Sequence, residues 1–211
     1  MIEKIITKVT YGLAPYYKKA AGKNDAAKQV GWRDAVAQER RFRALAHLLP
    51  LDKAFSINDL GCGQGDLLYF LLNRGFKALD YAGYDVIEEM IGLAKQKYGN
   101  GNGKFSLVKE PSEIRNADFT VASGIFSLRM DVVDEKWLAY ILDTLMQIDT
   151  KSIKGFAFNC LTKYSDAEYM KPELYYADPL FIFDHCKKKF SKNVALLHDY
   201  EEFDFTIIVR K

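Results

Sequence analysis

The sequence is poor in the residues that hold a secreted or metal-bound scaffold together. Only three of its 211 residues are cysteines, at positions 62, 160 and 186, and none has CxxC spacing. An odd number of cysteines without that spacing argues against a disulfide framework and against a zinc site. We therefore expect three reduced thiols and no metal ligands.

Long apolar runs and a charge excess are also missing. No run of about 18 apolar residues is present, and charges interrupt every apolar cluster among the first 20 residues, which disfavours a membrane span and a signal peptide. The 30 basic and 28 acidic residues leave a net charge of only +2, so no overall field would recruit nucleic acid or an anionic membrane. We expect a cytoplasmic protein whose partner is a small molecule.

The bulk composition fits one globular domain. Hydrophobic residues make up 49% of the chain and charged residues 27%, with only 5 prolines, and a chain of this length can bury one sizeable core. The pattern changes near Pro50. Residues 28–49 have helical spacing of apolar side chains, so we expect a helical N-terminal cap over residues 1–50 and a core over residues 51–211.

After residue 50, short apolar runs alternate with helical periodicity. The pattern predicts strands at 55–60, 79–84, 105–108, 119–123 and 153–158, and helices at 67–73, 87–98 and 135–148. Such alternation indicates βαβ units and an α/β fold with a parallel sheet, covered by helices on both faces. A helix at 179–190 then precedes two strand-like runs, 194–198 and 203–209, whose short link fits a hairpin. The sheet should therefore end in an antiparallel strand.

The segment INDLGCGQGD, residues 57–66, lies where the first predicted strand turns into the first helix of the core. Gly61, Gly63 and Gly65 allow a sharp turn and a close approach of the backbone to a ligand. Asp85 follows Gly65 by 20 residues at the end of the second strand, where a carboxylate can accept both ribose hydroxyls of an adenosine group. Loop and acid together predict a nucleotide-like cofactor.

Three details favour S-adenosylmethionine over NAD. The glycines are spaced GxGxG and not GxGxxG, and Asp66 at the start of the helix would repel a pyrophosphate. Asp59 lies inside the turn, where an acid suits a cationic ligand such as an ammonium or a sulfonium. The hairpin-like end of the chain is also unlike a classical NAD domain. An NAD-dependent oxidoreductase is the alternative.

Residues 55–211, about three quarters of the chain, resemble the class I S-adenosylmethionine-dependent methyltransferases. The acid near GxGxG in that family matches Asp59 and the three glycines, and its ribose-binding acid matches Asp85. The resemblance implies a Rossmann-like, seven-stranded mixed sheet with an antiparallel last strand, and methyl transfer as the activity.

Further residues are candidates for contact with the cofactor because of their places beside these motifs, after the third and fourth strands, or in the N-terminal helices. They are Cys62, Val86, Glu110, Ser123, Gly124, Trp32 and Arg41. Arg41 could pair with the cofactor carboxylate. Trp32 could equally belong to the core, and Glu110 could equally be an exposed turn residue.

The acceptor is predicted to be a small molecule methylated on oxygen or nitrogen. The segment after the fourth strand lacks the acid or Asn, two prolines and aromatic typical of enzymes that methylate planar amino groups. Positioning alone can carry methyl transfer, so a base is optional, and His198 and Asp131 are the candidates. The predicted substrate contacts are Phe126, Arg129, Asn159, Tyr164, Tyr175 and Tyr176, the last three in an insertion at about 160–178.

Two alternatives to these assignments stay open. Each tyrosine of the insertion could pack the lid onto the sheet instead of touching the acceptor, and His198 could be an ordinary edge-strand histidine. A non-catalytic cofactor-binding or accessory protein of the same fold is the alternative to an enzyme, because no catalytic side chain is obligatory.

Overall fold

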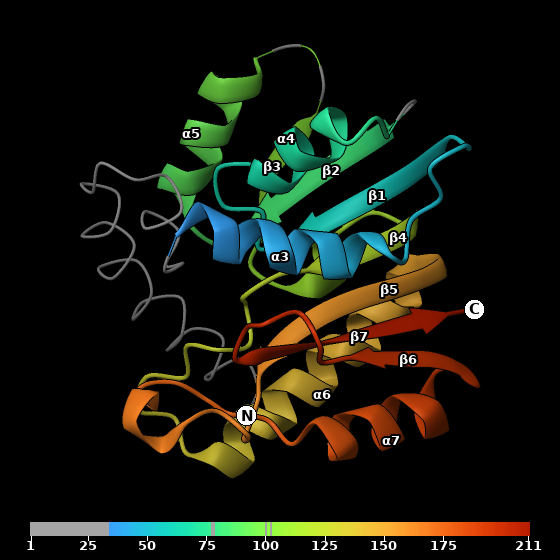
Figure 1. Ribbon diagram of the computed structural model, residues 1–211. Helices are drawn as coiled ribbons and strands as arrows, with labels where there is room; N and C mark the ends of the chain where they lie inside the picture. The colour runs from blue at the N-terminus through green and yellow to red at the C-terminus, as the bar shows by residue number, and fades with distance from the viewer. Residues whose placement is uncertain (1–33, 77–78, 100, 102) are drawn as a thin grey trace.

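The computed structural model describes residues 34–76, 79–99, 101 and 103–211. These residues form a sheet of seven strands in the order β3-β2-β1-β4-β5-β7-β6 (Figure 1). The strands are β1 (Phe55–Leu60), β2 (Leu79–Asp85), β3 (Lys104–Leu107), β4 (Ala117–Ala122), β5 (Ser152–Leu161), β6 (Asn193–Leu197) and β7 (Asp204–Arg210). β1 to β5 pair in parallel, and β7 runs antiparallel between β5 and β6. The predicted mixed sheet is confirmed.

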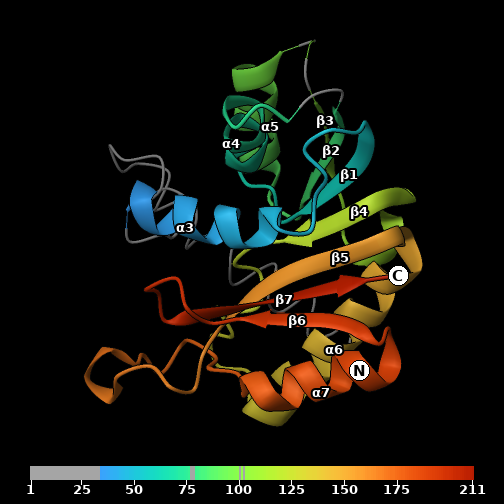
Figure 2. The same cartoon turned by 45° about the vertical axis from the view of Figure 1, so that its right-hand side comes forward.

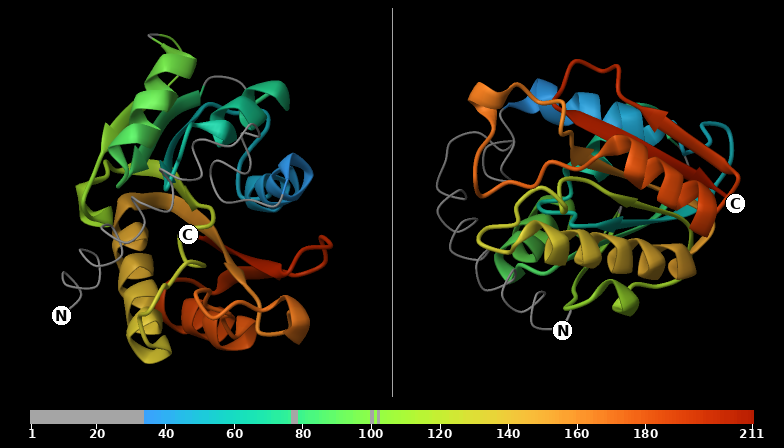
Figure 3. Two further views of the ribbon diagram at one scale, coloured as in Figure 1. Left: turned by 90° about the vertical axis from the view of Figure 1, so that its left-hand side faces the viewer. Right: turned by 90° about the horizontal axis from the view of Figure 1, so that it is seen from below.

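Helices cover both faces of this sheet, as predicted (Figures 2 and 3). One apolar cluster joins the sheet to α3 (Ala35–Ala46), α4 (Asp66–Asn73) and α5 (Glu88–Tyr98), and a second joins it to α6 (Asp134–Lys151) and α7 (Pro179–Lys189). Each cluster removes large apolar side chains from water, which is the main term that stabilises the layers.

Capping residues fix where two of the helices begin. Asp34 accepts a hydrogen bond from the backbone N–H of Ala37 (2.8 Å) at the start of α3. Asp178 accepts from Leu180 at the start of α7, where Pro179 occupies the first helical position. Both acids satisfy N–H groups that the first turn leaves without partners.

Most predicted element boundaries agree with the structure to within two residues. α6 ends at Lys151, three residues beyond its predicted end. β5 continues to Leu161, three residues beyond its predicted end, because its outer part pairs with β7. The predicted helix at 28–49 corresponds to α3, which begins at Ala35. Most of the predicted N-terminal cap, including Trp32, lies outside the described residues.

The insertion after β5 lies against the segment that follows β4. Its regular structure is one short 3-10 helix, η2 (Ala167–Tyr169), and a bridge between Thr162 and Ala177 closes its base. The backbone N–H of Tyr175 donates to the carbonyl of Ser127 (2.8 Å). Within the part of the chain that the structure describes, no helix has the length and apolar character needed to cross a membrane.

Candidate functional site

The glycine loop lies where the strand order of the sheet reverses. β1 has β2 on one side and β4 on the other, so the carboxyl ends of β1 and β4 flank the crevice in which open α/β sheets bind ligands. Gly61 and Gly65 have φ of +78° and +81°, a region that residues with a Cβ rarely adopt. The loop therefore needs glycine at both positions for its backbone conformation alone.

Close packing is a second reason for these glycines. A Cβ on Gly61 would lie 2.1 Å from Cγ2 of Ile125, and a Cβ on Gly65 would meet the rings of Tyr98 and Phe105 at 2.8 to 3.0 Å. The loop is thus held between the segment after β4 on one side and β3 with α5 on the other. The glycine spacing seen in the sequence therefore lets the loop pack closely against its own neighbours.

Asp85 joins the glycine loop to the end of β2. One of its carboxylate oxygens accepts from the N–H of Gly63 and the other from the N–H of Ile87, both at 2.9 Å. Burial raises the pKa of Asp85, although hydrogen bonds from Gly63, Ile87 and Val86 oppose the rise. Each carboxylate oxygen has a second lone pair, so Asp85 can hold the loop and still accept hydroxyl groups of a ribose. Val86 is partly exposed beside it.

Asp59 places a buried acid behind the loop. Its side chain is only 2% exposed and accepts a hydrogen bond from the hydroxyl of Tyr81 (2.5 Å). Burial raises the pKa of Asp59 to about 7, the Tyr81 hydrogen bond lowers it, and the charges of Asp85 and Asp66 raise it further. A positive charge bound nearby would favour the ionised form, which fits the predicted cationic ligand.

Tyr81 is the residue of this site that sequence reasoning missed. In the parallel register Ile57 lies beside Tyr81 and Asp59 beside Gly83. The place that a side chain at Gly83 would take is filled by Cys62 and Phe105. Alternation along β2 puts Tyr81 and Gly83 on the same face as Asp59. This signal is present in the sequence once the register of the two strands is known.

Asp66 occupies the N-terminus of α4, the place where a dinucleotide fold holds a pyrophosphate. Its carboxylate pairs with Lys97 (2.5 Å) and accepts from the amide of Gln38 (3.3 Å). The positive end of the helix dipole already has an anionic side chain there. This arrangement agrees with the argument that the loop does not hold a pyrophosphate.

Asn159 and Phe126, both predicted to contact the substrate, are core residues, each with 0% of its surface exposed. The amide of Asn159 accepts from the N–H of Gly124 (2.8 Å) and donates to the hydroxyl of Ser123 (3.1 Å). Phe126 packs edge-on against Phe158. The structure does not support a substrate contact for either, because both side chains are buried in the apolar layer or bonded to their own neighbours.

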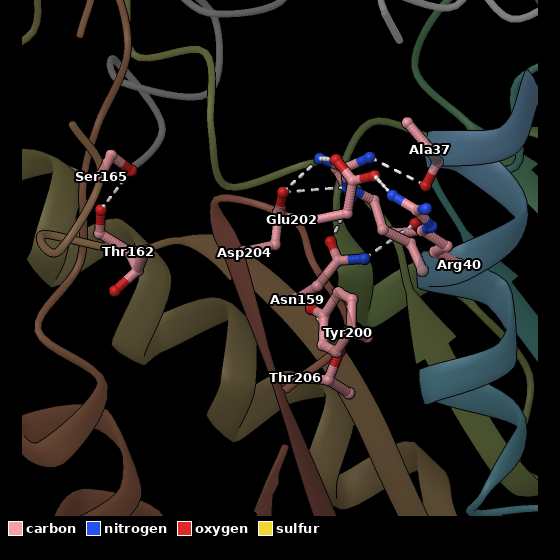
Figure 4. A network of polar contacts seen from close by, with 12 residues as sticks. Ala37, Arg40, Asn159, Thr162, Ser165, Tyr200, Glu202, Asp204 and Thr206 are labelled. Atoms are coloured by element: carbon pink, nitrogen blue, oxygen red, sulfur yellow. Dashed lines mark hydrogen bonds and ion pairs between the residues drawn. The ribbon is translucent and has the colours of Figure 1, made fainter. Parts of the chain in front are cut away.

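Arg41, predicted to pair with a cofactor carboxylate, lies elsewhere. Arg41 is 6% exposed, and its guanidinium forms a buried ion pair with Asp204 of β7, to which its Nε donates at 2.9 Å. The guanidinium also lies 3.4 Å from a carboxylate oxygen of Glu202. Figure 4 shows Asp204 and Glu202 facing the α3 residues Ala37 and Arg40. The arginine therefore fastens α3 to the end of β7, a role that differs from the predicted one.

The candidate acceptor residues on the insertion fall into two groups. Tyr164 is 58% exposed, and its ring centroid lies 6.2 Å from that of His198, itself exposed just after β6. Tyr175 is buried, which raises the pKa of its hydroxyl to about 12, and the hydroxyl of Tyr176 accepts from the N–H of Lys171. Tyr164 and His198 thus form one exposed aromatic pair, and the other two tyrosines hold the insertion in place.

The remaining candidates have local roles in this structure. Arg129 donates to backbone carbonyls of Val132 (2.8 Å) and Leu174 (3.2 Å) and so joins the β4 segment to the insertion. Glu110 is partly exposed before a 3-10 turn and accepts from Ser112. Asp131 is exposed. Their predicted contacts with cofactor or acceptor stay predictions.

Cys62, which lies within the loop, is a packing residue. Its thiol is buried, which raises its pKa well above the usual value, and a Cβ on Gly83 would come within 2.9 Å of its sulfur. Such a thiol is unreactive. A contact between its backbone and the cofactor stays a prediction.

Comparison with known proteins places the chain in a family. No protein-family model matches the sequence. A Mycobacterium tuberculosis (H37Rv) protein named "Putative methyltransferase Rv1506c" is 52% identical over 158 residues, which are 74% of this chain and 93% of that protein. The chain belongs to the methyltransferase family.

Solved methyltransferase structures share the fold of this methyltransferase. Magnesium protoporphyrin IX methyltransferase from Synechocystis, solved with bound S-adenosylhomocysteine, superposes with a TM-score of 0.63 at 15% identity, covering 96% of each chain. The N-methyltransferase NodS of Bradyrhizobium japonicum, in complex with the same molecule, gives a TM-score of 0.66 at 10% identity, covering 94% of this chain and 97% of that one. The class I, Rossmann-like architecture is thereby confirmed.

Proposed function

We propose that this methyltransferase transfers a methyl group from S-adenosylmethionine to an oxygen or nitrogen atom of a small molecule. The observation that carries the proposal is the pairing of the glycine loop with Asp85. That pairing puts a carboxylate with free lone pairs beside a backbone turn at the switch point of the sheet. The related methyltransferases solved with S-adenosylmethionine or its product support the same cofactor.

The residues present fit this cofactor. Asp85 would accept its ribose hydroxyls, the glycine loop would lie against it without side chains, and Asp59 would face its positive charge. When bound, S-adenosylmethionine supplies a methyl group on a sulfonium, ready for in-line displacement. The protein then contributes by holding the acceptor at near-attack distance and by excluding water.

The acceptor side of the proposal rests on the exposed pair Tyr164 and His198. A tyrosine ring offers an apolar surface with a polar tip, and an imidazole can take the proton that an acceptor hydroxyl releases. His198 lies beside Tyr164 of the insertion, and Asp131 follows two residues whose N–H groups donate to the insertion, so both stay candidates for the base. The reduced cytoplasmic setting and the lack of a nucleic-acid partner remain parts of the proposal, supported by the buried thiols and the small net charge.

Turnover tests the proposal. The purified protein is incubated with S-adenosylmethionine and a panel of hydroxyl- and amine-bearing metabolites, and S-adenosylhomocysteine is quantified by mass spectrometry. We expect acceptor-dependent product with at least one compound, and its loss in Asp85→Ala. Cofactor binding without product across a broad panel would favour the accessory-protein alternative.

A further inference from the structure

The turn that follows β4, residues 123–125, is held by a side chain of the neighbouring strand β5. The amide oxygen of Asn159 accepts from the N–H of Gly124 (2.8 Å), and its nitrogen donates to the hydroxyl of Ser123 (3.1 Å). Asn159 is fully buried near the outer end of β5. Both ends of one amide therefore hold two successive residues of the turn.

The same turn is in contact with the glycine loop. Ile125 comes next in the chain, and its Cγ2 occupies the space that a side chain at position 61 would need, 2.1 Å from an ideal Cβ on Gly61. A continuous set of contacts thus runs from the Asn159 amide through the turn to the loop. A shift of the turn would move Ile125 against the backbone of Gly61.

The backbone conformation of Gly124 explains why the hydrogen bonds from Asn159 matter for the turn. Its φ is +77°, and glycine populates positive and negative φ about equally, so the chain by itself does not select this conformation. The hydrogen bond to its N–H selects it. An apolar residue at position 159 would keep the site buried, but it would leave the N–H of Gly124 and the hydroxyl of Ser123 without these partners.

We propose that Asn159 is a positioning residue for the cofactor, which holds the β4 turn in the conformation that shapes the glycine loop for binding. This inference rests on the proposed function, because it assigns a role within the S-adenosylmethionine site. Asn159 acts through Ser123, Gly124 and Ile125, and it does not touch the ligand. Buried in β5, Asn159 then serves the geometry of the glycine loop as well as the stability of the sheet.

Thr206 provides a matched control for ordinary destabilisation. It is the cross-strand partner of Asn159, and it is likewise fully buried. Its hydroxyl lies 3.0 Å from that of Tyr200, within the network that Figure 4 shows beside Asn159. Thr206→Val removes this buried hydrogen bond to Tyr200 at the adjacent position, whereas the hydrogen bonds from Asn159 to the turn stay in place.

The experiment compares three variants of the whole protein with the wild type, measuring the Kd for S-adenosylhomocysteine by calorimetry and the Tm by circular dichroism. Asn159→Leu keeps the size and removes both hydrogen bonds. Asn159→Asp keeps an acceptor for the N–H of Gly124, and the Ser123 hydroxyl can rotate to donate to the other oxygen. The buried carboxylate should lower the Tm of Asn159→Asp, so this variant separates stability from positioning.

We expect the Kd to rise about tenfold in Asn159→Leu, to stay within about threefold of wild type in Asn159→Asp, and to be unchanged in Thr206→Val although its Tm falls. The positioning role is overturned if Asn159→Leu binds as tightly as wild type, or if affinity follows Tm across the three variants. A wild type that fails to bind S-adenosylhomocysteine overturns the proposed function itself, which is a separate outcome.

Discussion

Asp59, the buried acid behind the glycine loop, makes the stability of this methyltransferase depend on pH. Replacing this one residue measures its contribution to that dependence. Asp59 is neutral in the folded protein up to a pKa of about 7, because burial opposes its charge and Asp85 and Asp66 add repulsion. In the unfolded chain its pKa returns to about 3.8. Asp59→Asn keeps the shape and an acceptor for the Tyr81 hydroxyl, and it cannot ionise.

The sign and size of the effect follow from linkage. Because the folded state holds the proton more tightly, the stabilising contribution of neutral Asp59 is complete below pH 3.8 and is lost as the pH rises through 7. A pKa raised from 3.8 to about 7 corresponds to about 4 kcal/mol. The folded protein loses about 2 to 3 kcal/mol of this stabilisation between pH 5 and pH 8.

Urea unfolding of both proteins at pH 5 and at pH 8 measures this difference. We expect the unfolding free energy of Asp59→Asn, relative to wild type, to be about 2 to 3 kcal/mol higher at pH 8 than at pH 5. Titrating groups that do not interact with Asp59 act equally in both proteins and cancel in the comparison. A relative free energy that is the same at both pH values would refute the assignment of a raised pKa to Asp59.

Three further predictions concern the cofactor acid, the buried ion pair and the thiols. Asp85→Ala should weaken S-adenosylhomocysteine binding by about 1.5 to 3 kcal/mol, the usual worth of hydrogen bonds to a charged group; a calorimetric loss of only a few tenths would exclude Asp85 as the ribose ligand. Arg41→Met should lower the unfolding free energy by about 3 to 5 kcal/mol, because it leaves Asp204 buried without this partner, and adding Asp204→Asn should recover part of the loss. If that double variant unfolds no later than Arg41→Met in urea, the ion pair is not the cause. All three cysteines are buried with raised pKa values, so iodoacetamide at pH 8 should label them only after unfolding; rapid labelling of the native protein would contradict their burial.

Most of the fold could be predicted from the sequence because each element carries a local signal. Period-two and period-3.6 patterns give the strands and helices, and the short link between the predicted runs 194–198 and 203–209 fits an antiparallel hairpin. The extension of β5 to Leu161 had no such signal. That extension depends on pairing with β7, which is a contact between distant parts of the chain.

The site was predictable only where the backbone defines it. The glycines and Asp85 lie at positions that any βαβ unit brings to the ligand edge. Arg41 could not be placed, since its partner Asp204 is 163 residues away in the sequence. Asn159 lies in a strand that is buried from Gly155 to Cys160, where alternation does not tell an inward residue from one that faces a ligand. Phe126 lies in the turn after β4, where no strand alternation applies.

Calorimetric titration of the wild-type protein with S-adenosylhomocysteine, and separately with NADH, tests the central claim most directly. Both molecules contain an adenosine whose ribose Asp85 could hold, but only NADH brings a pyrophosphate to the N-terminus of α4, where Asp66 lies. We predict binding of S-adenosylhomocysteine at one site per chain and no measurable binding of NADH. Tight binding of NADH alone would contradict the account of the glycine loop.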